Sequence, residues 1–75
     1  PKGNNQMTVT TKEIAQHYKS AMDSVRLINE IVASGDTDTE SVDTKSRNQE
    51  HLESMVAKDF WTTEDLTPLT SAINA

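Results

Sequence analysis

The residues of this chain that could bind a metal ion or move a proton are two histidines and a short acidic run. His17 and His51 are its only imidazoles, and no cysteine is present. A zinc site needs three or four protein ligands, and no third ligand stands at helical spacing from either histidine. A proton-transfer role would also need a carboxylate partner and a pocket, for which so small a chain has little room. We therefore expect both to be surface or interface histidines.

The acidic run Asp36-x-Asp38-x-Glu40 has the alternating carboxylates of a calcium-binding loop. An EF-hand loop that begins at Asp36 needs glycine at its sixth position and glutamate at its twelfth. Those two positions hold Ser41 and Arg47. We expect these acids to cap a helix in a solvated turn, and we predict no metal site.

Nucleophilic and phosphate chemistry also lack their sequence motifs. No G-x-S-x-G elbow occurs, and no base is placed to activate a serine or threonine. Gly3 and Gly35 are the only glycines, too few for a phosphate-binding loop. We predict that the protein is not an enzyme and uses no cofactor.

The segment KDFW at positions 58–61 is the most site-like part of the chain. Adjacent aromatic residues flanked by charge often anchor interfaces, which makes Phe60 and Trp61 candidate contacts to a partner. Alternatively, both rings cover the end of a small helical core, with Leu66 and Leu69 folding over them. The second interpretation is favoured because a core with so few apolar residues needs its largest side chains.

Length and composition are those of one small domain. The chain has 75 residues, 33% of them hydrophobic, and a net charge of −5. Residues 1–35 carry four basic and three acidic side chains (+1), and residues 36–75 carry three basic and nine acidic ones (−6). The acidic second half argues against nucleic-acid binding, which needs clustered Lys and Arg. No apolar run approaches the roughly 18 residues that span a membrane, and no secretory segment is present, so we expect a cytoplasmic protein without membrane contact.

The clearest structural pattern marks the start of a long helix. Thr10 and Glu13 have the spacing of a capping box, in which each side chain accepts from the other residue's backbone N–H. Gly35 suits the left-handed residue that follows a helix end. We therefore predict a helix over residues 11–34.

One side of this helix is a heptad seam, with apolar residues spaced four and three apart. Its members are Ile14, Tyr18, Ala21, Val25, Ile28 and Val32. Met22, Leu27 and Ile31 lie outside the seam and widen the apolar arc to about 220°, at about 100° per residue. A helix on one core needs an arc of only about 100° or more. Two neighbouring helices are therefore required to cover this one.

A second helix is predicted over residues 39–58, with Thr37 and Glu40 as its capping box. Its first half is polar. Its second half carries the apolar residues Leu52, Met55, Val56 and Phe60. The short connection after Gly35 makes the two helices antiparallel neighbours. The polar half then lies beside the widest apolar arc of the first helix and leaves part of it uncovered.

A third, short helix is predicted over residues 67–74. Pro68 fits its first turn, where a missing N–H costs nothing. Its apolar face would come from Leu66, Leu69, Ala72 and Ile73. Because two helices and a short third one leave a wide arc to cover, we expect copies of the chain to associate.

The run VAKDFWTTEDLTP at positions 56–68 resembles the C-terminal part of short uncharacterised proteins of tailed bacteriophages. The resemblance covers about twenty residues and includes no catalytic motif. It implies a small virion-associated or accessory protein, located in the virion or in the host cytoplasm. No functional residue is carried over from it.

Together these patterns predict an all-α protein, an antiparallel helical hairpin plus a short C-terminal helix that self-associates into a helical bundle. Residues 1–8 are expected to be a disordered leader left from an expression vector, and residues 9–75 a single helical domain. The function predicted is a non-catalytic structural or interaction protein that forms homo-oligomers and binds protein partners. The predicted interface comprises Tyr18, Ala21, Val25, Leu27, Ile28, Ile31, Val32, Phe60 and Trp61.

An alternative is a monomeric acidic inhibitor or mimic that binds a basic site on a partner protein. Its charge would come from Asp36, Asp38, Glu40, Asp43, Glu50, Glu53, Glu64 and Asp65. This alternative requires the acids to converge on one face, and Lys45 and Arg47 interrupt that face along the second helix.

Overall fold

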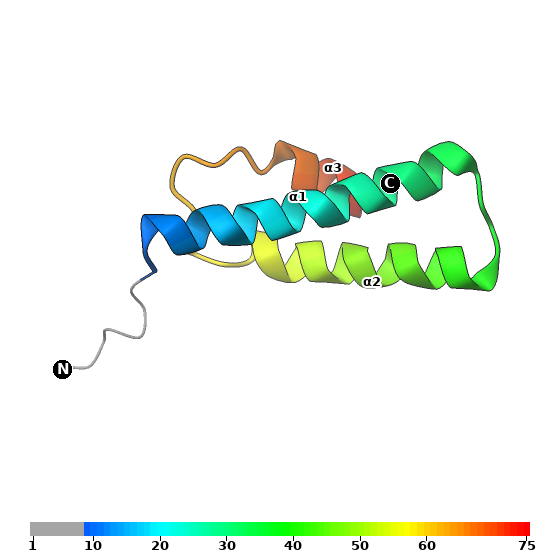
Figure 1. The fold of residues 1–75 in the computed structure, drawn as a ribbon, viewed down its shortest axis with the longest axis horizontal. Coiled ribbons are helices and arrows are strands. Elements are labelled where there is room, and N and C mark those ends of the chain that lie inside the picture. Colours follow the sequence, from blue (N-terminus) through cyan, green and yellow to red (C-terminus); the bar gives the residue numbers. More distant parts are fainter. Residues whose placement is uncertain (1–8) are drawn as a thin grey trace.

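The computed structural model describes residues 9–75, which form three α-helices (Figure 1). These are α1 (Thr11–Ser34), α2 (Thr39–Val56) and α3 (Thr67–Ile73). No strand occurs among the described residues, so the predicted all-α fold is confirmed. The leader predicted at residues 1–8 lies outside the described residues.

Across that same described part of the chain, none of the helices combines the length and the apolarity needed to cross a membrane.

The start and end of α1 follow its sequence pattern. The backbone N–H of Glu13 donates to Thr10 Oγ1 (3.1 Å), and the N–H of Thr10 donates to Glu13 Oε1 (3.0 Å). This reciprocal capping box satisfies two donors that a helix start otherwise leaves unpaired. At the other end Gly35 has φ 73°, and its N–H donates to the carbonyls of Ile31 and Val32 at 3.2 Å each. A side chain at this left-handed position would be strained, which explains the glycine.

The start of α2 at Thr39 matches the prediction, whereas its cap residue and its end differ from it. Its N-cap is Asp38, whose Oδ1 accepts from the N–H of Ser41 at 2.7 Å, so the predicted Thr37–Glu40 capping box is wrong. A carboxylate at this position also interacts favourably with the helix dipole. The helix ends at Val56, two residues before the predicted end. Phe60 consequently lies in the loop after α2.

The start of α3 matches the predicted residue, and its end falls one residue early. It begins at Thr67 with Pro68 in its first turn, and it ends at Ile73. Gln49 of α2 holds this last turn, because its Nε2 donates to the carbonyls of Ala72 and Ile73 at 3.1 Å each. These are among the carbonyls that a helix end leaves unpaired.

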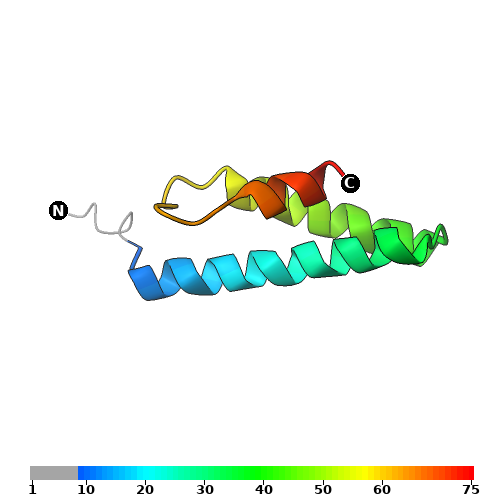
Figure 2. The same cartoon turned by 90° about the horizontal axis from the view of Figure 1, so that it is seen from above.

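The helices pack so that α1 and α2 run antiparallel, and α3 lies against both of them (Figures 1 and 2). Their shared core draws on all three helices and consists of Ala21, Val25, Ile28, Leu52, Met55, Leu69 and Ala72. Ile28, Leu52 and Leu69 are fully buried. The two neighbours that the wide apolar arc of α1 requires are therefore α2 and α3 of the same chain.

Candidate functional site

Four aromatic rings gather where the start of α1 meets the loop after α2. His17 stacks on Phe60, with ring centroids 5.2 Å apart and an interplanar angle of 24°. Trp61 meets Phe60 edge-on at 4.8 Å and Tyr18 edge-on at 6.1 Å. The rings thus form a continuous chain that fastens the loop to α1.

Two polar atoms of this aromatic cluster, those of Tyr18 and Trp61, form hydrogen bonds within the chain. The Tyr18 hydroxyl donates to the carbonyl of Asp65 at 2.7 Å. Trp61 Nε1 donates to the carbonyl of Met55 at 2.8 Å, in the last turn of α2. Both rings also pack against the core. This arrangement supports the interpretation that Phe60 and Trp61 cover the end of the core.

The two histidines occupy different surroundings. His17 belongs to the aromatic cluster, and His51 is exposed on α2. Within residues 9–75, no three His, Cys, Asp or Glu side chains come close enough together to hold a metal ion.

Four carboxylates accept hydrogen bonds from backbone N–H groups, and we call them the backbone-bound carboxylates. They are Glu13 with Thr10 (3.0 Å), Asp38 with Ser41 (2.7 Å), Glu64 with Thr62 (3.0 Å) and Asp65 with Thr67 (3.0 Å). These N–H donors favour the charged form and hold the pKa of each carboxyl below its ordinary value. Their role is to cap helices and turns.

Five of the eight acids predicted for a charge mimic lie at two ends of the molecule. Asp36, Asp38 and Glu40 surround the turn between α1 and α2, whereas Glu64 and Asp65 lie in the loop at the opposite end (Figure 1). Three of these five also serve as backbone-bound carboxylates. The other three acids of that prediction, Asp43, Glu50 and Glu53, lie along α2 between these two ends.

The residues predicted as an interface between copies fall into three groups by exposure. Ala21, Val25 and Ile28 are buried in the core of one chain, so they present almost no surface to a second molecule. Tyr18, Ile31, Phe60 and Trp61 are half-buried. Leu27 and Val32 are 38% and 49% exposed. The heptad seam is thus mainly an internal packing surface.

Exposed apolar side chains collect at the turn end of the hairpin. We call Leu27, Ile31, Val32 and Val42 the hairpin-end patch. Val42, on α2, is 47% exposed and was missed from the sequence. The sequence does carry one signal for Val42: it is the one large apolar residue in the polar first half of α2. Ile31, Val32 and Val42 line a shallow hollow of about 360 Å³ between the two helices.

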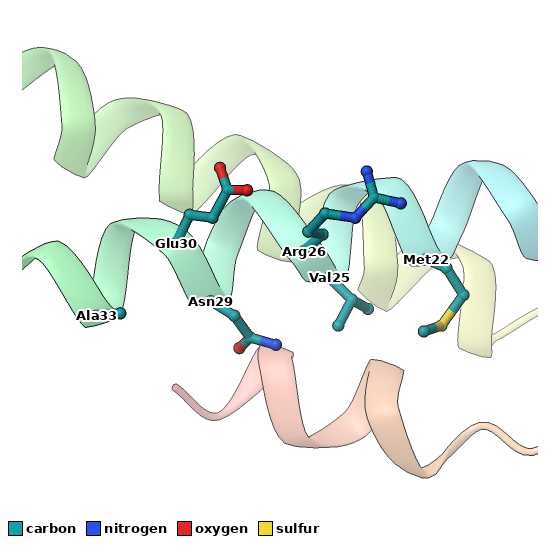
Figure 3. Close-up of a pocket in the computed structure, with 6 residues that line it drawn as sticks. All are labelled: Met22, Val25, Arg26, Asn29, Glu30 and Ala33. Atoms are coloured by element: carbon teal, nitrogen blue, oxygen red, sulfur yellow. The ribbon is translucent and has the colours of Figure 1, made fainter.

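A second shallow hollow, of about 450 Å³, lies along the outer side of α1 (Figure 3). We call its lining the α1 flank; it consists of Met22, Val25, Arg26, Asn29, Glu30 and Ala33. Figure 3 shows Arg26 and Glu30 along the edge away from α3, while Val25 and Asn29 point toward the α3 side. Apolar and charged groups therefore share this surface.

The two hollows differ in the chemistry of their linings. The hairpin-end patch is apolar with acids beside it, and the α1 flank carries one cation and one anion. Comparison with family models, with curated protein sequences and with solved structures finds no match to this chain.

Proposed function

We propose that the protein is a small non-catalytic interaction protein that binds a partner protein through the hairpin-end patch. One observation carries this proposal: among the described residues, the exposed large hydrophobic side chains are Leu27, Val32 and Val42. Val32 and Val42 lie close to the turn between α1 and α2, and Leu27 lies about two helical turns before the end of α1. Exposed apolar side chains of this kind mark interaction sites.

The surroundings of the patch indicate the type of partner. Asp36 lines the same hollow and Asp38 and Glu40 are exposed just after it in the chain, so the acids of this rim outnumber Lys45, the one base in the lining. A polar rim around an apolar centre is the usual organisation of a protein interface, and the sign of the rim favours a partner with basic residues at its edge. Four apolar side chains make a small centre, so the binding is expected to be transient.

The origin of the protein enters this proposal through the resemblance of positions 56–68 to tailed-bacteriophage proteins. A virion-associated or accessory role is consistent with a rigid helical body that carries one binding end. The first partners to examine are therefore virion proteins and proteins of the bacterial host cytoplasm.

The experiment compares three immobilised proteins for the partners they retain. The patch variant carries Leu27→Ser, Val32→Ser and Val42→Ser, and the control carries Gln16→Ser, Lys19→Ser and Glu53→Ser at exposed positions of the same helices. A partner retained by the wild type and the control is then purified and titrated directly. We expect the patch variant to bind it at least about tenfold more weakly, since an apolar contact is lost at each position.

Two outcomes would contradict the proposal. One is a purified partner that binds the patch variant as tightly as the wild type. The other is binding by the wild type that disappears in about 0.5 M salt with no loss in the patch variant, because that result assigns binding to exposed charge. The second outcome would favour the acidic inhibitor instead.

A further inference from the structure

The three basic residues of α1 lie on one stripe of the helix. Lys12, Lys19 and Arg26 are seven residues apart, so each step turns only about 20° around the helix and advances about 10.5 Å along it. All three are exposed. Glu30 follows Arg26 by about one turn and continues the stripe with the opposite charge. The stripe is therefore basic over most of α1 and acidic toward the turn.

Four residues of the α1 flank, two of them apolar and two polar, have a matching spacing. Met22, Arg26, Asn29 and Ala33 are four, three and four residues apart, which is the spacing of a helix–helix contact seam. Met22 is half-buried and packs on the core, and Ala33 is exposed. Neither α2 nor α3 contributes to the lining of this hollow. A second helix can therefore lie along it without displacing the chain's own helices.

The charged residues of the α1 flank indicate which helix binds there. In the described part of the chain the one ion pair joins Arg26 to Asp23 at 3.1 Å, with side chains 68% and 52% exposed. Glu30 has no ion-pair partner there. We propose that the α1 flank binds the α1 flank of a second copy in antiparallel orientation, about a two-fold axis at the level of Ile28.

This symmetry makes each charge complementary to its counterpart. Arg26 falls opposite Glu30 of the second copy, and the axis repeats the same pair in reverse. Lys19, nine residues before Ile28, falls opposite the turn of the second copy, which carries Asp36 and Asp38. A parallel arrangement would place like charges opposite each other, so the charge pattern selects the antiparallel one.

The dimer is expected to be weak, because its apolar contact is limited to small parts of Met22, Val25 and Ala33. Exposed ion pairs add little affinity each and mainly fix orientation. The inference goes beyond the proposed function, since it concerns a different face of α1 and a different partner. A negative result for the dimer does not contradict the proposed partner binding, and a negative result for partner binding does not contradict the dimer.

The test measures mass in solution by light scattering and sedimentation over a hundredfold dilution. We expect the wild type to approach twice 8.3 kDa at the high-concentration end. Arg26→Glu and Glu30→Arg each convert two attractive pairs into two repulsive ones, so each should raise the dissociation constant at least about tenfold. An equimolar mixture of the two variants should regain the dimer as a heterodimer. The double variant R26E/E30R should regain it as a homodimer.

Two controls separate the interface from general charge and from the other surface. Lys12→Glu changes a cation of the same stripe that lies beyond the end of the second copy, so it should leave the mass unchanged. The patch variant should also keep the wild-type mass. Circular dichroism verifies that every variant is folded, which exposed substitutions on a helix surface allow, and Arg26→Ala offers a milder loss of the same pair.

A wild type that stays monomeric at every concentration would overturn the proposal and leave the flank for another molecule. So would unchanged dimerisation of both single charge variants, or failure of their mixture to associate. If the patch variant dissociates and the charge variants do not, the copies contact each other through the hairpin-end patch and the proposal is wrong.

Discussion

Replacing Leu69 with alanine tests the central feature of this fold, the covering of α1 by the short helix α3. Leu69 is fully buried and belongs to the core cluster together with Ala72. If α3 takes the place that a second copy would otherwise occupy, truncating Leu69 must destabilise a single chain. A protein whose α1 is covered chiefly by a second copy would tolerate the change.

The size of the effect follows from the three carbon atoms removed. At about 0.8 kcal/mol per buried CH₂, the transfer term is about 2.4 kcal/mol. The cavity left behind adds to it, and buried Leu→Ala changes fall in a range of about 2–5 kcal/mol. A 75-residue chain has a total free energy of unfolding of about 4–11 kcal/mol. We therefore expect Leu69→Ala to remove a large fraction of the stability.

The assay is urea unfolding, followed by circular dichroism and by the fluorescence of Trp61, the only tryptophan. Leu27→Ala is the matched control, because it removes the same atoms from a side chain that is 38% exposed. We expect the control to cost about 1 kcal/mol, since only part of its apolar area leaves water. Both variants are measured at a concentration at which light scattering gives the monomer mass.

A loss below about 1 kcal/mol for Leu69→Ala, equal to that of the control, would refute the reasoning. It would mean that α3 is not packed on the core in solution. The same result would favour the heptad seam of α1 as an interface between copies.

Three further predictions concern the indole hydrogen bond of Trp61, the buried core and the pH dependence of stability. Trp61→Phe removes the indole hydrogen bond to the carbonyl of Met55, and we expect it to lower the free energy of unfolding in urea by about 1–2 kcal/mol. Val25→Asp places a charge at a site that is 5% exposed within one chain, so helical circular dichroism should be lost at concentrations where the wild type is a folded monomer. The backbone-bound carboxylates have lowered pKa values in the folded state, so their contribution to stability is present above the ordinary carboxyl values of 3.8 and 4.5 and is lost as pH falls through the lowered ones. The melting temperature should accordingly hold from pH 7 to about 5 and fall below that, and a melting temperature that rises in acid would contradict this assignment.

Local interactions explain why the bounds of α1 could be read from the sequence. The capping box at Thr10 and the left-handed glycine at Gly35 involve residues only three or four positions apart. The helix α2 starts at the predicted Thr39, but its cap was misplaced by one residue because Thr37 and Asp38 are both good caps, and the carboxylate makes the bond to Ser41. Its end was misplaced because the apolar spacing continued to Phe60, whereas the indole of Trp61 turns back onto the last turn.

The candidate surfaces were less predictable, because they depend on what covers each side of α1. A heptad seam shows that a helix needs partners, but it does not say whether they belong to the same chain. The width of the arc correctly indicated two neighbours. That α3, with seven residues, would serve as one of them depends on contacts such as those of Gln49 with Ala72 and Ile73, which are distant in sequence. Val42 stays exposed because α3 ends before it reaches the turn.

The covering of the seam also changes what self-association of this protein would mean. An oligomer built on Ala21, Val25 and Ile28 would be obligate, since separating the copies would expose a core. Those side chains are buried within one chain, so the chain can fold first and associate afterwards. The surface that we propose for association is the α1 flank, where Arg26 and Glu30 contribute orientation more than affinity. A dimer of this kind responds to local concentration and to salt, and it forms where copies are held close together, as in an assembly.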